Sequence, residues 1–186
     1  MSEKANIDLM FATTNGSLRG VEAALKDGAD IDSEVLPGIG GAALFNACIK
    51  GHVDIARLLL SKGAYVAKRA LSSSLAPIHA AASQGMTEVV ELLVYHGATV
   101  DIRDGFQYTP LMRACIHKYV DTVRRLIELG ARVDLTDADG YNQIAQRHGI
   151  EAGDRHWKEC MRLIQEARKT KLLRCCNPTC CKPGYR

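Results

Sequence analysis

Apolar residues recur at helical spacing in four short stretches of the chain, and each stretch ends at a Gly-Ala pair. Apolar positions three and four residues apart form one face of a helix, so each stretch is predicted to be an amphipathic helix. The pairs begin at Gly28, Gly63, Gly97 and Gly130, at intervals of 35, 34 and 33 residues. Glycine readily adopts the left-handed conformation that commonly ends a helix. The pattern therefore predicts four helix ends in register, each followed by a short extended arm.

A second helix is expected before each amphipathic one. In the third and fourth repeats it begins with Pro77 and Pro110, at a first turn where a missing N–H is harmless. Pairs of small residues at 47–48, 81–82 and 114–115 would let these helices approach their neighbours closely. The chain is thus predicted to consist of helix pairs stacked side by side.

The period, the Thr-Pro-Leu-x-x-Ala start, the Gly-His turn and the Leu-Leu-x-x-Gly-Ala-x-Val-Asp ending resemble the ankyrin repeat. The resemblance covers residues 7–150. It implies an all-α ankyrin-repeat solenoid of helix-turn-helix units with β-hairpin-like arms, formed by residues 1–167 and followed by a tail, 168–186. About five repeats are expected, the first and last being atypical caps, at 7–32, 36–68, 70–102, 104–136 and 137–167.

The repeats depart from the ankyrin pattern at its polar positions. The pattern's Thr and His bond locally and between repeats, but His79 stands without its Thr, which Ala76 replaces, and Thr109 without its His, which Met112 replaces. A hydrogen bond contributes about 0.5–1.5 kcal/mol net. We therefore expect the stack to depend more on apolar packing than an idealised array would.

The resemblance also implies a function, which is binding a partner protein through the concave face made by the arm tips and first helices. A connected apolar patch is expected there, with Phe106 and Tyr108 as aromatic anchors; the alternative is that these two rings pack under neighbouring arms. The predicted partner-binding residues are Ile39, Gly41, Ile49, Lys50, Ser73, Leu75, Ser83, Gln84, Phe106, Tyr108, Arg113, Ile116, His117, Asp139 and Tyr141.

Charge and composition narrow the classes of partner. The 186 residues carry a net charge of +3, but six basic and no acidic residues lie in 168–186, which leaves 18 basic and 21 acidic residues in 1–167. Residues 1–167 thus have a net charge of −3, which makes them a poor surface for binding nucleic acid. Membrane association is expected only if tail cysteines are acylated. Without a signal sequence or an apolar run of about 20 residues, the expected location is cytoplasmic or nuclear.

Catalysis is not expected. The chain contains no phosphate-binding loop, dinucleotide fingerprint or Gly-x-Ser-x-Gly elbow. Most of its histidines fall at positions that repeats use structurally or at helix ends, and Cys48 and Cys115 fill small-residue core positions. No cofactor is therefore expected, apart from zinc under one interpretation of the tail.

The tail leaves three interpretations open. Its cysteines are Cys175, Cys176, Cys180 and Cys181. They resemble the opening of a MYND-type zinc finger, but a structural zinc site needs four ligands and the further Cys and His pairs of that family do not follow. Cysteines beside basic residues could instead be S-acylated, which would tether the chain to a membrane. The third interpretation is an unstructured end.

Overall fold

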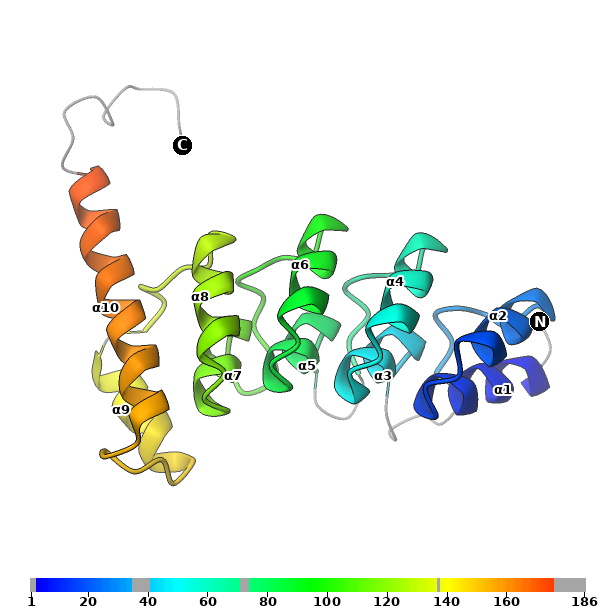
Figure 1. The fold of residues 1–186 in the computed structure, drawn as a ribbon, viewed down its shortest axis with the longest axis horizontal. Helices are drawn as coiled ribbons and strands as arrows, with labels where there is room; N and C mark the ends of the chain where they lie inside the picture. Colours follow the sequence, from blue (N-terminus) through cyan, green and yellow to red (C-terminus); the bar gives the residue numbers. More distant parts are fainter. Residues whose placement is uncertain (1–2, 35–40, 71–73, 137, 176–186) are drawn as a thin grey trace.

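The computed structural model describes residues 3–34, 41–70, 74–136 and 138–175, and within these the side chains of 138–139 and 171–175 are left aside. The described residues form ten helices and no strand (Figure 1). The helices are α1 (Glu3–Thr14), α2 (Leu18–Lys26), α3 (Ala43–Lys50), α4 (Val53–Ser61), α5 (Pro77–Ser83), α6 (Thr87–Tyr95), α7 (Pro110–Ile116), α8 (Val120–Glu128), α9 (Ala138–Arg147) and α10 (Arg155–Cys175).

The helices are arranged as five pairs stacked along one axis (Figure 1). The first helices α1, α3, α5 and α7 contact one another in sequence, and the second helices α2, α4, α6, α8 and α10 form the neighbouring row. The predicted all-α repeat solenoid with atypical ends is confirmed. The arms that join the pairs are turns in the part of the chain that the structure describes.

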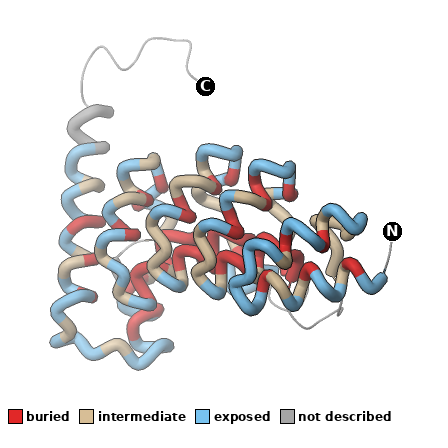
Figure 2. Tube along the Cα trace, turned by 45° about the vertical axis from the view of Figure 1, so that its right-hand side comes forward, coloured by how far each residue is buried: buried red, intermediate tan, exposed pale blue. Residues whose placement is uncertain are grey.

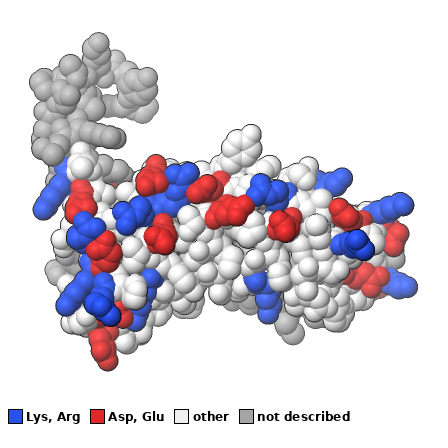
Figure 3. Space-filling view, viewed as in Figure 1, with Lys and Arg blue, Asp and Glu red and all other residues white. Residues whose placement is uncertain are grey.

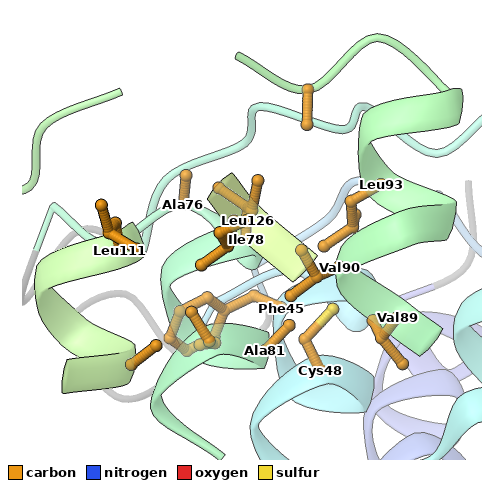
Figure 4. Packing of buried hydrophobic residues seen from close by; sticks show 14 of the residues in the cluster. Phe45, Cys48, Ala76, Ile78, Ala81, Val89, Val90, Leu93, Leu111 and Leu126 are labelled. Atoms are coloured by element: carbon orange, nitrogen blue, oxygen red, sulfur yellow. The ribbon is translucent and has the colours of Figure 1, made fainter. Parts of the chain in front are cut away.

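The core lies between the two rows of helices and continues through every repeat (Figure 2). In Figure 4, Val90 and Leu93 of α6 lie near Ile78 and Ala81 of α5 and Cys48 of α3. All six residues of the small pairs are completely buried: Ala47, Cys48, Ala81, Ala82, Ala114 and Cys115. Their short side chains bring helices of adjacent repeats close together, as the sequence predicts.

Glycines shape the helix ends and also the contacts between repeats. The Gly-Ala glycines have positive φ, as expected for helix ends. A second set, in the turn between the two helices of a pair, faces a side chain of the next repeat. A Cβ atom built on Gly85, where φ is +70°, would lie 2.5 Å from Cδ1 of Tyr119. The equivalent Gly51 faces Met86 in the same way. A side chain of the following repeat therefore packs directly against each of these turn glycines.

The last repeat differs from its predicted form. Its first helix begins at Ala138, so Asp139 lies in α9 and not at an arm tip. Tyr141 was predicted to precede this helix at the surface, but it lies within α9 and is 2% exposed. The physical reason is the missing proline: Pro110 fixes the start of α7 and disfavours helix before it, whereas one repeat later Gln143 stands there and the helix extends backwards.

The first helix starts earlier than the expected first repeat, and the last helix is long, as the sequence pattern beyond Trp157 predicts. Helix α1 begins at Glu3, four residues before the expected start of the first repeat, and α10 continues to Cys175. Across the described residues, none of the helices combines the length and apolarity that a membrane span requires.

We predict that alanine at Gly97 and alanine at Gly85 lower the free energy of unfolding by different amounts, although both glycines have positive φ. Gly97→Ala should destabilise by about 1–2 kcal/mol, the cost of left-handed backbone alone, because no heavy atom lies within 4 Å of the added Cβ. Gly85→Ala should cost more, since its Cβ must also displace the ring of Tyr119. Urea unfolding measures both, and equal losses would contradict the proposed fit between repeats.

Candidate functional site

A buried histidine fixes the arm between the third and fourth repeats. The His79 side chain is completely buried. The backbone N–H of Ala76 donates to its Nδ1 at 3.2 Å, and its Nε2 lies 3.0 Å from the carbonyl oxygen of Ile102 and 3.1 Å from that of Tyr108. Since Nδ1 accepts, the proton is on Nε2, which donates to both carbonyls. The bonds between repeats are thus present although the threonine partner is missing.

A buried carboxylate shapes the tip of that arm. Asp104 is 2% exposed, and its Oδ1 accepts from the backbone N–H groups of Phe106, at 2.8 Å, and Tyr108, at 3.0 Å. Its Oδ2 accepts from Arg113 Nε of α7 at 2.7 Å. Both arms are closed by a backbone bond, from Ala70 N–H to the Leu75 carbonyl and from Asp104 N–H to the Tyr108 carbonyl, but Ala70 has no carboxylate to add to it. The carboxylate therefore gives the fourth repeat an arm braced against its own first helix.

The braced arm presents two aromatic rings of different exposure. Phe106 is 64% exposed, whereas Tyr108 is 7% exposed. Their rings stack with centroids 6.3 Å apart, and the Arg113 guanidinium carbon lies 5.7 Å from the first centroid and 5.3 Å from the second. The Tyr108 hydroxyl accepts from Arg147 of α9 at 3.1 Å. Phe106 is thus held in place on an exposed tip, while Tyr108 joins the arm to the last repeat.

Two histidines flank this cluster. His117 is the C-cap of α7, and His148 follows α9 with its ring centroid 5.8 Å from that of Tyr108. Partial burial lowers the pKa of both imidazoles, and the charge of Arg113 lowers them further. Both rings are therefore neutral near pH 7, and the positive charge of the cluster comes from its arginines.

A pocket of about 210 Å³ lies between the arm and α9. Its buried floor includes Met112 and Ile144, its lining also includes polar residues such as Thr136 and Gln143, and Arg103 and Arg147 lie at its more exposed rim. The guanidinium of Arg103 donates to the carbonyl oxygen of residue 107 at 3.1 Å. The arrangement offers an open, partly apolar pocket beside two arginines and an exposed aromatic ring.

The predicted binding residues fall into groups of different exposure. We define the arm-side surface as the surface made by the arms and the first helices α3, α5, α7 and α9. Residues that the structure exposes there are Lys50, Gln84, Phe106 and His117, and partly exposed ones are Ile49, Leu75, Ser83 and Arg113. Ile39 and Ser73 lie outside the described residues, as does the side chain of Asp139.

Part of the connected apolar patch expected from the sequence is buried in the structure, and Ile39 lies outside the described residues. Gly41, Tyr108, Ile116 and Tyr141 are buried, so little of their surface is exposed, although Tyr108 also lines the pocket. Gly41 lies against the Phe45 ring, where a Cβ would come within 2.8 Å of Cδ1. Tyr108 packs as the alternative describes and Phe106 is exposed; a binding role for either ring stays a prediction.

Sequence reasoning missed four residues of the cluster: Arg103, Asp104, Arg147 and His148. The Asp104-Gly105 pair was a usable signal, because an aspartate before glycine often closes a turn with its own side chain. Arg147 and His148 gave no such signal, since they lie in the last repeat, where the family pattern fails.

The cysteines of the described residues do not form a metal site. Cys48, Cys115 and Cys160 are buried free thiols, and burial raises the pKa of Cys48 and Cys115. Within the described ranges no group of three or more His, Cys, Asp or Glu side chains is placed to hold a metal ion. Cys176, Cys180 and Cys181 lie outside these ranges and the side chain of Cys175 is not described, so the three interpretations of the tail stay predictions.

Comparison with known families agrees with this geometry. A sequence model described as ankyrin repeats (3 copies) matches residues 70–137, and one described as ankyrin repeat matches residues 40–70. Together they span more than half of the chain. The chain belongs to the ankyrin-repeat family.

Individual ankyrin proteins are similar over part of their length. Protein fem-1 homolog A-like of Mus musculus is 38% identical over 97 residues, which are 52% of this chain and 14% of that protein. Protein phosphatase 1 regulatory subunit 27 of Homo sapiens is 47% identical over 68 residues, 37% of this chain and 44% of that protein. Transient receptor potential cation channel subfamily A member 1 of Drosophila melanogaster is 29% identical over 143 residues, 75% of this chain and 12% of that protein. The chain thus spans less than half of each relative.

We predict that protonation of His79 destabilises the stack. Burial lowers the pKa of this imidazole, and a proton on Nδ1 would remove the acceptor of the Ala76 N–H. Below about pH 6.5 the unfolded state therefore binds a proton that the folded state resists, and stability falls by up to about 1.4 kcal/mol per pH unit. Stability is full above this pH.

Urea unfolding at pH 7.5 and 5.5 measures the loss. His79→Gln should be less stable at pH 7.5 but lose less on acidification than the wild type. His156→Gln, at an exposed position, should keep the wild-type pH dependence. An unchanged pH dependence in His79→Gln would rule out the histidine as its source.

We predict that Asp104→Ala destabilises the chain by about 3 kcal/mol or more, because removing one partner leaves a largely buried charge on Arg113 uncompensated. Two backbone N–H groups of the arm also lose their acceptor. Glu88→Ala removes a carboxylate from an exposed ion pair with Arg57 and should have almost no effect. Thermal and urea unfolding compare the two variants, and similar losses would show that the buried pair is not a main support of the arm.

Proposed function

We propose that the chain is a protein-interaction module that binds a partner protein through the arm-side surface. The observation that carries this proposal is Phe106, an aromatic side chain that is 64% exposed although its backbone and ring are fixed by Asp104 and Arg113. Aromatic residues dominate many protein interfaces, and a ring that is already fixed loses little entropy on binding. This arm is therefore suited to be a central contact.

The charge distribution supports the choice of surface. Along α4, α6, α8 and α10, side chains of opposite sign alternate (Figure 3). Several of them are paired with each other, including Arg57 with Glu88 and Arg125 with Glu91. A row of satisfied ion pairs is a typical solvated face. On the arm-side surface the exposed ring of Phe106 lines a pocket, and an exposed apolar group beside a pocket is a feature of a binding site.

The family supports the class of function. Ankyrin stacks generally bind other proteins and are generally not enzymes, because their working surface is open and not enclosed. One relative is named as a regulatory subunit of protein phosphatase 1, a name that denotes a protein partner for that relative. An adaptor or scaffold role for the present chain is consistent with this, and we propose it without naming the partner.

Affinity capture with matched variants tests the proposal. If the ring is a binding hot spot, Phe106→Ala should capture about ten-fold less, or still less, of the proteins that the full wild-type chain captures. Tyr95→Ala removes another exposed aromatic, 85% exposed at the end of α6, and should retain them. Quantitative mass spectrometry measures the ratio. Equal capture by both variants would contradict the proposed surface.

A further inference from the structure

The pocket beside Phe106 has a size that restricts its occupant. Its volume is about 210 Å³. Cavities for drug-sized ligands and cofactors occupy about 300–1,000 Å³, whereas a cavity of about 150 Å³ is sufficient for benzene. The pocket therefore has room for one aliphatic or aromatic side chain. Met112 and Ile144 are buried at its floor, which suits an apolar group.

The rim of the pocket is positively charged. Arg103 and Arg147 line it from the arm and from α9. Each donates one hydrogen bond to a neutral oxygen, the carbonyl of residue 107 or the hydroxyl of Tyr108. Within the part of the chain that the structure describes, neither forms an ion pair with a carboxylate. Their remaining N–H groups are thus available to an anionic partner.

The nearby carboxylate does not compensate these charges. Asp104 is buried, and its oxygens are used by Arg113 and by two backbone N–H groups. Elsewhere on the surface, exposed arginines such as Arg162 have carboxylate partners within the chain. The two rim arginines differ because nothing among the described side chains fills that role, and guanidinium groups bind carboxylates with well-defined paired geometry.

We propose that this pocket binds an acidic segment of a partner protein, with one apolar side chain inserted between the arm and α9 and neighbouring carboxylates on Arg103 and Arg147. The inference rests on the proposed function and specifies the chemistry of the partner. A nucleic acid fits less well, because residues 1–167 carry a net charge of −3 and a continuous polyanion requires an extended basic surface.

Fluorescence anisotropy with defined peptide pools tests the proposal. The acidic pool has a central Leu, Ile, Phe or Tyr flanked by Asp and Glu, and the control pool replaces these with Asn and Gln. The full chain should bind the acidic pool at least about ten-fold more tightly than the amide pool, as expected for desolvated charge pairs. Equal affinity for the two pools, or stronger binding of a single-stranded oligonucleotide, would overturn it.

Charge variants assign the binding to the rim. The double variant Arg103→Gln/Arg147→Gln should bind the acidic pool about ten-fold or more weakly than the wild type does. The matched control Arg57→Gln/Arg162→Gln changes the net charge equally at exposed positions on α4 and α10 and should bind as the wild type does. Arg103→Glu/Arg147→Glu should reject the acidic pool and bind a basic pool instead. Unfolding curves check that each variant is folded, and equal binding by the rim and control variants would refute the assignment.

The two proposals fail in different ways. If Phe106→Ala abolishes protein capture but the acidic and amide pools bind alike, the arm-side surface binds a partner of another chemistry. If Phe106→Ala and Tyr95→Ala capture alike, the interaction surface itself is wrong.

Discussion

The structure depends on the close approach of helices in adjacent repeats. Alanine and cysteine at the centres of α3, α5 and α7 are completely buried, and they keep the helix axes near enough for the larger residues of α4, α6 and α8 to fill the remaining space (Figure 4). Each repeat lacks a core of its own and buries its apolar face against its neighbours. The turn glycines extend this constraint, since a side chain from the next repeat occupies the space that a Cβ would need.

Polar groups then decide how the arms are held on this apolar framework. His79 links its own helix to two carbonyl groups of the following arm, and Asp104 binds the backbone of that arm and the guanidinium of Arg113. Both groups are buried, so an unsatisfied hydrogen-bonding atom would be costly. They act on adjacent segments, and together they place the exposed tip between the third repeat and α9.

The fold was predictable because it depends on a repeated local pattern. Glycine-terminated helices in register and small residues at a fixed phase predicted the stack and the core. The binding residues were harder, because the same pattern does not tell how far a side chain is covered by the next repeat. Ile116 and Tyr141 were expected at the surface, but both are buried, and Tyr141 lies within α9, which begins before the expected helix start. Arg103 and Arg147, which are 44 residues apart in the sequence, meet only through the pocket between arm and helix.

In the fourth arm, the backbone conformation of the tip does not depend on the identity of the side chain that the tip exposes. The carboxylate of Asp104 contacts the main-chain nitrogen of residue 106 and not its side chain. The loop geometry is therefore independent of which side chain stands there, as long as the carboxylate and its guanidinium partner are kept. In evolution or in engineering, the side chain at position 106 can therefore be replaced to suit a different partner, while the hydrogen bonds that hold the loop are kept.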